Sequence, residues 1–252
     1  MPLVLFANTK GGSGKTTAAL VFAGEVLKHG AKLVLFEGDP NQPLARWAGR
    51  RGVPVINGSD AKPRSTAECA QAIEKAAAVG SRLLVIHDGD EDRVFDWIEA
   101  ATAWAHFVVA DPEGSPNQWL QDVAHSADLV VIPFAPTALD AHQVSKTVTV
   151  LGRVGRRTGR HVPHRVLLTR AGAIQTRDER KIRQALTEGG MPVLKTSLRD
   201  RPAFRAIFDV DKDLSELDGG SVNGLDGARV NAAELANEII SVLKAAELEI
   251  AA

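Results

Sequence analysis

The chain has 252 residues, 44% of them hydrophobic, and a formal net charge of −1 at pH 7. This length fits one large α/β domain, 1–252, with a sizeable core, and the balanced charge excludes a global field that attracts nucleic acid or membranes. The single cysteine, Cys69, excludes an internal disulfide and a cysteine-rich metal or iron–sulfur site within one chain. We find neither a signal peptide nor an apolar run long enough to span a membrane, and we expect a soluble, cytoplasmic protein.

The first half of the chain alternates short apolar runs with amphipathic stretches. The apolar runs predict strands at residues 3–7, 32–36, 53–56, 82–87 and 106–110. The spacing of apolar residues predicts helices at 15–29, 44–50, 66–79 and 91–103. Gly30 follows the first of these helices, as expected for a helix end.

The second half continues the same alternation. Strands are predicted at 129–133, 165–169 and 192–196, and helices at 140–157 and 202–208. Two N-cap patterns, Thr176-x-x-Glu179 and Asn231-x-x-Glu234, predict helices that run to about residues 188 and 248. This order of elements predicts a doubly wound, mostly parallel sheet flanked by helices in three α/β/α layers. We find no linker and no internal repeat, which favours one domain.

A glycine-rich stretch joins the first predicted strand to the first predicted helix and reads Lys10-Gly11-Gly12-Ser13-Gly14-Lys15-Thr16-Thr17. A strand, a glycine-rich turn and a helix in this order are the context of a phosphate-binding loop. The glycines allow a tight turn whose backbone N–H groups, together with the helix N-terminus, face an anion. We expect Lys15 to reach the β- and γ-phosphates and the Thr16 hydroxyl to ligate Mg²⁺. The alternative is a turn that binds nothing.

Asp111 closes the apolar run 107–110 and is followed by Glu113 and Gly114. A carboxylate at the carboxyl end of a central strand, about a hundred residues after the loop, is typical of the position that holds Mg²⁺ beside a phosphate loop. We therefore predict that Asp111 is a metal ligand. The alternative is an ordinary acidic residue in a loop.

Charge is distributed unevenly along the chain. Residues 146–183 contain eleven Lys and Arg and two acids, whereas residues 200–252 contain eleven Asp and Glu and five Lys and Arg. Arginines in excess suit phosphate contacts, and without interleaved aromatic residues or a helix-turn-helix pattern we expect non-specific DNA binding. The alternative is a solvated helix face. The residues predicted to contact DNA are Arg153, Arg156, Arg157, Arg160, Arg177, Arg180 and Lys181.

The phosphate loop resembles the deviant loop of the ParA/MinD family of ATPases, because Lys10 precedes its glycines and Thr9 stands where an ordinary loop has its first glycine. The resemblance implies that ATP and Mg²⁺ are bound and that ATP is sandwiched in a homodimer. It also implies that Lys10 crosses to the partner subunit's nucleotide. The residues with implied nucleotide contacts in the loop are Gly11, Gly12, Ser13, Gly14, Lys15, Thr16 and Thr17.

Later stretches resemble the same family. Asp39-Pro40 matches its second carboxylate motif, which implies that Asp39 contacts the magnesium shell and activates the attacking water, although Glu37 replaces the usual first aspartate. Thr169-Arg170 and the loop that ends at Pro202 stand where relatives flank adenine; a plain surface loop is the alternative there. The stretches 39–47, 111–114, 128–133 and 201–208 look like a ParA subgroup found on plasmids and in conjugative or T-DNA transfer loci.

The resemblance implies an ATPase that dimerises on ATP, binds DNA non-specifically and is stimulated by a small partner protein, so that it partitions plasmid DNA or a related cargo in association with the nucleoid. A metabolic amidase or ligase of the same fold, similar to cobyrinate or dethiobiotin synthetases, is one alternative. A MinD-like positioning ATPase is another, and the acidic terminal helix argues against membrane attachment.

Overall fold

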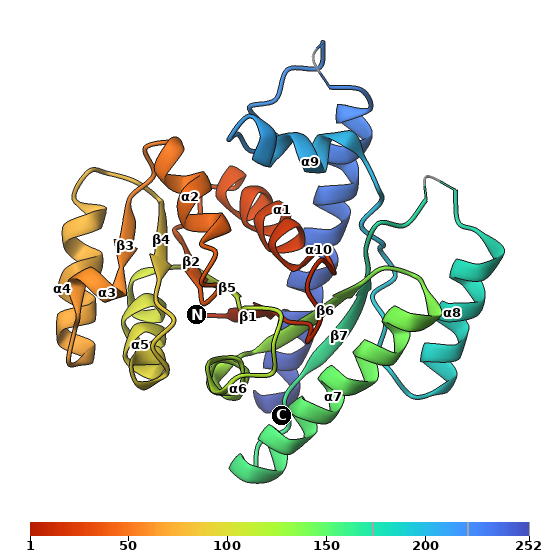
Figure 1. The fold of residues 1–252 in the computed structure, drawn as a ribbon, viewed down its shortest axis with the longest axis horizontal. Helices are drawn as coiled ribbons and strands as arrows, with labels where there is room; N and C mark the ends of the chain where they lie inside the picture. The colour runs from red at the N-terminus through yellow and green to blue at the C-terminus, as the bar shows by residue number, and fades with distance from the viewer. Residues whose placement is uncertain (173, 221, 252) are drawn as a thin grey trace.

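The fold comes from a computed structural model that describes residues 1–172, 174–220 and 222–251, without the side chains of 138–141, 247 and 249–251 (Figure 1). The described residues form one seven-stranded sheet in which every pairing is parallel. Its strands are β1 (Leu3–Phe6), β2 (Leu33–Glu37), β3 (Val55–Asn57), β4 (Leu83–His87), β5 (Phe107–Asp111), β6 (Leu129–Phe134) and β7 (His164–Leu168). Their order across the sheet is β3-β4-β2-β5-β1-β6-β7.

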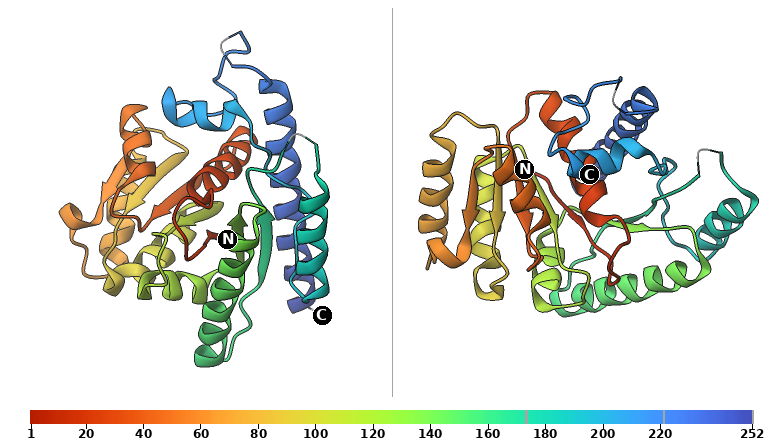
Figure 2. Two further views of the ribbon diagram at one scale, coloured as in Figure 1. Left: turned by 45° about the vertical axis from the view of Figure 1, so that its right-hand side comes forward. Right: turned by 45° about the horizontal axis from the view of Figure 1, so that its top comes forward.

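Two layers of helices cover the two faces of this sheet (Figures 1 and 2). One layer consists of α1 (Lys15–Lys28), α2 (Pro43–Arg50), α9 (Pro202–Asp209) and α10 (Leu225–Ala251). The other consists of α4 (Thr66–Ala77), α5 (Val94–Trp104), α6 (Gln118–Ser126) and α7 (Ala138–Thr158), with α8 (Arg177–Glu188) beside α7. Short helical turns, α3 (Gly58–Ala61) and η1 (Glu91–Arg93), complete the connections.

The strands are apolar on both sides because both faces of the sheet are buried. Along β1, Val4 and Phe6 pack against the layer of α1, whereas Leu3 and Leu5 pack against the opposite layer. This alternation follows from the two-residue period of a strand, and buried parallel strands therefore read as continuous apolar runs. The predicted fold class, a doubly wound parallel sheet in three layers, is confirmed.

Two predicted elements differ from the structure, and helix α6 is an addition to them. Residues 192–196 make a single parallel bridge, Val166 to Val193, instead of a strand, because the amides of Lys195 and Thr196 turn away and donate to the Glu238 carboxylate on α10. The terminal helix begins at Leu225, ahead of the predicted N-cap Asn231, and includes it. Helix α6 is absent from the predicted elements, although Asn117 caps its N-terminus by accepting from the Leu120 amide at 3.0 Å.

The Asn231 side chain does not cap a helix. Its amide oxygen accepts from the Arg199 backbone at 2.9 Å, and its amide nitrogen donates to the Ser197 carbonyl at 2.9 Å. Asn231 thus ties α10 to the loop between α8 and α9. A buried amide that satisfies two backbone groups of a distant segment follows the same residue preference as an N-cap, which explains the wrong boundary.

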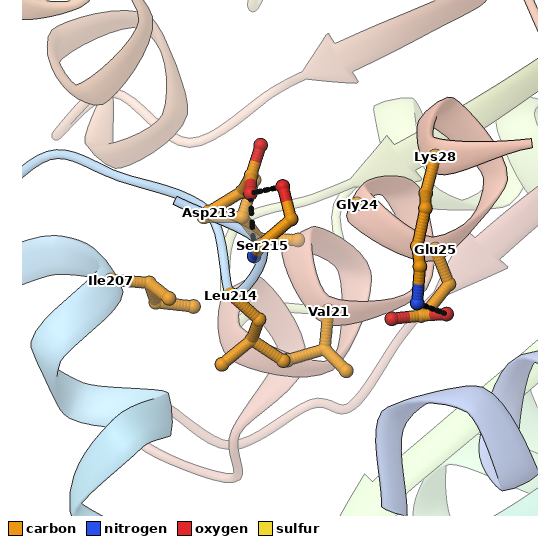
Figure 3. Close-up of a pocket in the computed structure, with 9 residues that line it drawn as sticks. Val21, Gly24, Glu25, Lys28, Ile207, Asp213, Leu214 and Ser215 are labelled. Carbon is orange, nitrogen blue, oxygen red and sulfur yellow. Dashed lines mark hydrogen bonds and ion pairs between the residues drawn. The ribbon is translucent and has the colours of Figure 1, made fainter. Parts of the chain in front are cut away.

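The loop that follows α9 packs against α1. Figure 3 shows Ile207 and Leu214 pointing toward Val21 of α1, beside the ion pair between Lys28 and Glu25, whose atoms lie 3.6 Å apart. The space enclosed there is about 10 Å³, room for about one water molecule. This junction is therefore packing between α1 and the loop, and not a ligand site.

Candidate functional site

The glycine-rich loop leaves the carboxyl end of β1, near the middle of the sheet, and enters α1. Gly12 and Gly14 have φ angles of 73° and 90°, in the left-handed region that favours glycine. Gly14 is the N-cap of α1 and has no side chain with which to cap it, and the first turn of the helix carries no acidic residue. The amides at this helix end are thereby available to an anion, and the helix dipole favours negative charge there.

Three neighbouring segments hold the loop in place. Asn8 donates to the Pro133 carbonyl of β6 at 2.7 Å and accepts from the Lys10 amide at 3.0 Å. The Thr169 hydroxyl, just past β7, donates to the Ser13 carbonyl at 2.8 Å. Backbone of the loop lies so close to Gly114 that a Cβ there would come within 2.9 Å of the Gly11 nitrogen. The loop is therefore preorganised by β6, β7 and the segment after β5.

Thr16 and Asp111 meet at the foot of the loop. The Thr16 hydroxyl donates to Asp111 Oδ2 at 2.6 Å, while Oδ1 of the same carboxyl is buried and has no hydrogen-bond partner among the described residues. Burial raises the pKa of Asp111 to about 7; the Thr16 hydrogen bond and the charge of Lys15 lower it, and the charge of Asp39 raises it. An orphaned carboxylate oxygen beside a hydroxyl is the oxygen donor set that Mg²⁺ takes when it also binds phosphates.

Asp39 and Glu37 lie at the end of β2, next to Asp111 on β5, and the sheet register pairs Glu37 with Asp111. Glu37 is fully buried and accepts from the amides of Leu44 and Ala45 at 2.6 and 2.9 Å, so it caps the N-terminus of α2. Burial raises the pKa of Glu37 to about 7, although these two hydrogen bonds lower it. Asp39 is half-buried, and its carboxylate accepts from the Asn41 amide at 2.8 Å.

Other expected site residues occupy different surroundings. Lys15 is buried at the start of α1, and Lys10 is half-buried at the first turn of the loop. Among the described residues, no group of three or more His, Cys, Asp or Glu side chains is arranged to hold a metal ion. The Asp88-x-Asp90-x-Asp92 run, which resembles a calcium loop, instead leads through η1 into α5, and Asp88 pairs with Arg93 at 2.7 Å.

A pocket of about 280 Å³ opens beside the loop, between β7 and α9. Thr169 lines it but is 1% exposed, and its hydroxyl is already engaged by the loop, so the structure places this side chain as a support for the loop. Arg170 is exposed with a φ of 51°, and Pro202 is exposed at the first turn of α9. Two aromatic side chains of α9, Phe204 and Phe208, also line the pocket, and the half-buried Phe208 offers a face for a base.

Sequence reasoning did not identify Phe204 and Phe208 as residues that line this pocket. Both belong to the stretch 201–208, whose apolar residues recur at the spacing of one helix face. That spacing is also typical of residues that pack in a core, and Phe204 is indeed 4% exposed. Only the position of α9 beside Gly14 and Thr17 distinguishes a pocket wall from core.

The predicted DNA contacts divide into two groups. Helices α7 and α8 lie next to each other (Figures 1 and 2). Six of the predicted contacts are exposed on these two helices: Arg153, Arg156, Arg157, Arg177, Arg180 and Lys181. Arg160 is different, because its guanidinium donates to the carbonyls of His125 and Ala127 at the end of α6. Its charge therefore serves the packing of α6 against the end of α7.

Within the described parts of the chain, no helix is both long and apolar enough to cross a membrane.

Comparison with known proteins gives consistent relatives. A family model described as VirC1 protein matches residues 1–56. The chain is 26% identical over 218 residues to a ParA protein of Rhizobium radiobacter, covering 86% of each chain, and 25% identical over 209 residues to a virC1 protein of the same organism, covering 82% of this chain and 80% of the relative.

Solved structures show the same architecture. A MinD cell division protein from Aquifex aeolicus superposes with a TM-score of 0.70 at 16% identity, covering 96% of this chain and 98% of that chain. An ATP complex of McdA from Cyanothece superposes with a TM-score of 0.69 at 17% identity, covering 95% of this chain and 96% of that chain. At these identities the two structures establish a shared fold.

Proposed function

We propose that this chain, which belongs to the ParA/MinD-like family, hydrolyses ATP to control a homodimer that binds DNA and positions a cargo. The observation that carries the proposal is the pair formed by Thr16 and Asp111, with an orphaned carboxylate oxygen at the foot of an open phosphate loop. A buried carboxyl with an unpartnered oxygen lowers the stability of the fold, because a neutral side chain in its place would be less costly to bury. A cation that arrives with the nucleotide would bind the orphaned oxygen of Asp111.

In this proposal the residues of one chain bind and orient the nucleotide. The amides of 11–17 and the Lys15 ammonium hold the phosphates, and the base enters the pocket that the half-buried Phe208 lines. Thr16 and Asp111 would hold Mg²⁺, which when bound neutralises charge on the phosphate oxygens. Asp39, at the adjacent strand end, orients the attacking water and accepts its proton.

The homodimer rests on Lys10. Lys10 is a second lysine ahead of the glycines, and the family resemblance assigns it to the partner subunit's nucleotide. The Lys10→Ala variant should bind ATP nearly as tightly as the parent chain but remain monomeric in light scattering with Mg·ATP, while Lys15→Ala should lose ATP binding itself. A Lys10→Ala variant that dimerises like the parent refutes the trans role.

DNA binding rests on the exposed cations of α7 and α8. Side chains such as Arg153 and Arg156 can neutralise phosphates without displacing a protein partner, and the removal of each such cation should reduce the salt slope of binding by about 1. We expect ATP-dependent, salt-sensitive retention of DNA of any sequence. Binding that ignores salt and survives the combined Arg153→Gln, Arg156→Gln and Arg177→Gln changes refutes this part of the proposal.

We infer that the cargo is plasmid DNA or a related cargo, by analogy with relatives that are named as ParA, VirC1 and carboxysome-distribution proteins. The experiment that separates this function from a metabolic amidase or ligase measures ATP turnover with DNA and a partner protein from a neighbouring gene, and separately with small carboxylic acids. Stimulation by DNA and the partner supports a positioning ATPase. Stimulation by a carboxylic acid alone refutes it.

A further inference from the structure

Helix α6 places a tryptophan directly beneath the loop that carries Asp39. Trp119 is 1% exposed, and its ring packs against Phe36 of β2 with centroids 4.8 Å apart. Its indole N–H donates to the Asp88 carbonyl at 2.8 Å. Glu91 accepts from the Trp119 amide at 3.3 Å, so both the backbone and the ring of this residue are anchored. The ring face is therefore a fixed surface.

Gly38 rests on that surface. A Cβ at Gly38 would lie 2.6 Å from Cε2 and 2.7 Å from Cδ2 of Trp119, closer than carbon atoms approach. On its other side the Gly38 amide donates to the Asp111 carbonyl at 3.1 Å. The residue between Glu37 and Asp39 is thus wedged between an indole ring and the end of β5.

The residues on either side of Gly38 are held as well. Glu37 is fixed by its two hydrogen bonds to the N-terminus of α2. After Gly38, the Asp39 carbonyl accepts from the Gln42 amide at 2.9 Å. Because Gly38 packs against the ring of Trp119, that ring fixes the position of the Gly38 backbone. The position of the Gly38 backbone in turn determines where the next residue, Asp39, lies relative to Asp111.

We propose that Trp119 is a positioning residue for ATP hydrolysis, acting through Gly38 on Asp39. This inference rests on the proposed function, because it assigns Asp39 to the hydrolytic step. Trp119 does not line the pocket beside the phosphate loop, and its indole N–H and amide are engaged by Asp88 and Glu91. Its replacement should therefore spare ATP binding and slow turnover, since displacing a reacting group by about 1 Å can cost about 100-fold in rate.

The chain offers a matched control. Trp97 on α5 is also fully buried in the same layer, and its indole N–H donates to the side chain of the same Asp88 at 2.8 Å. A Trp97→Leu change removes a ring of equal size and a hydrogen bond to the same residue, whereas the atoms nearest to a Cβ at Gly38 all belong to Trp119. It reports the combined effect of reduced packing and of a lost hydrogen bond to Asp88, without the contact to Gly38.

The experiment measures kcat, KM for ATP and nucleotide affinity by a fluorescent ATP analogue in the full-length protein with Mg²⁺. We expect Trp119→Leu to lower kcat about 10- to 100-fold with affinity within about twofold, Trp119→Phe to restore most of kcat, and Trp97→Leu to lower the unfolding midpoint without this loss of kcat. Circular dichroism and unfolding midpoints establish that each variant is folded. Equal effects of Trp119→Leu and Trp97→Leu on kcat would overturn the proposal.

A second variant keeps the test independent of stability. Gly38→Ala places a methyl group against the ring and should lower kcat, and adding Trp119→Leu should remove that collision. The double variant should therefore lose less activity than the product of the two single losses. Losses that simply multiply overturn the contact as the route to Asp39. Absence of hydrolysis by the parent chain refutes the proposed function instead, which separates the two failures.

Discussion

Replacing Asp111 by asparagine tests whether this buried carboxyl is kept for a cation. Asp111 is 0% exposed, and burial raises its pKa from 3.8 to about 7. Because the folded chain holds a proton that the unfolded chain releases, the carboxyl increasingly destabilises the fold as pH rises from about 4 to about 7, and by a constant amount above that. The destabilisation of the fold by Asp111 is thus largest at alkaline pH.

The magnitude follows from the shift. At about 1.36 kcal/mol per pKa unit, the carboxyl costs about 4 kcal/mol at pH 8 and about 2 kcal/mol at pH 5.5. Without nucleotide, the Asp111→Asn variant should therefore gain about 2 kcal/mol more over the parent at pH 8 than at pH 5.5, roughly 4–8 °C in Tm for a chain of this size. The unpaired amide hydrogens of asparagine cost the same at both pH values and cancel from this difference.

Thermal or urea unfolding at the two pH values, with and without Mg·ATP, measures the effect. Mg·ATP should raise the Tm of the parent chain and have a much smaller effect on the Asp111→Asn variant, so that the order of stability narrows or reverses when the ligand is present. A stability difference that is the same at pH 5.5 and pH 8 refutes the reasoning about burial. Equal stabilisation of both proteins by Mg·ATP refutes the assignment of Asp111 to the cation.

Three further changes have distinct expected outcomes. Burial favours a higher pKa for Asp88, but hydrogen bonds from arginine, backbone and tryptophan outweigh burial and lower the pKa. Asp88→Asn should therefore lower the unfolding free energy by about 3 kcal/mol in urea at pH 7. The difference in stability between the variant and the parent should narrow as the pH falls below about 4. Thr169→Val removes the hydrogen bond to the phosphate loop and should weaken ATP binding about fivefold in a fluorescence titration. Arg160→Ala should lower the unfolding free energy by about 1–3 kcal/mol with little change in DNA retention. Arg153→Ala should reduce DNA retention with little change in the unfolding free energy.

The sheet and the loop were predictable because their residues obey local rules. The apolar runs that form β1, β2 and β5 are buried on both faces, so their hydrophobicity is continuous and their positions are evident. The loop is recognisable by its glycines, because the left-handed φ angles at Gly12 and Gly14 leave few alternative residues. Asp111 could be placed at a strand end for the same reason, since it directly follows such a run.

Contacts between distant segments were not predictable from one sequence. Arg160 reads like its neighbours on α7, and only the position of the last turn of α6 turns its charge inward. Glu37 reads like a carboxylate of the metal site, yet the Pro43 turn directs the start of α2 onto it. The segment 192–196 has the composition of a strand. Two of its amides instead donate to the Glu238 carboxylate, and that contact depends on the position of α10.

The place of β1 in the sheet has a consequence for how the protein is made. β1 and its loop leave the ribosome before the strands that flank β1, which are β5 and β6, and the Ser13 carbonyl pairs with Thr169, which is 156 residues further along. At about 5–20 residues per second, that interval is roughly 8–30 s of synthesis. During this interval the growing chain carries an exposed apolar strand whose partner strands have not yet been synthesised. We expect chaperones to bind the chain during that time.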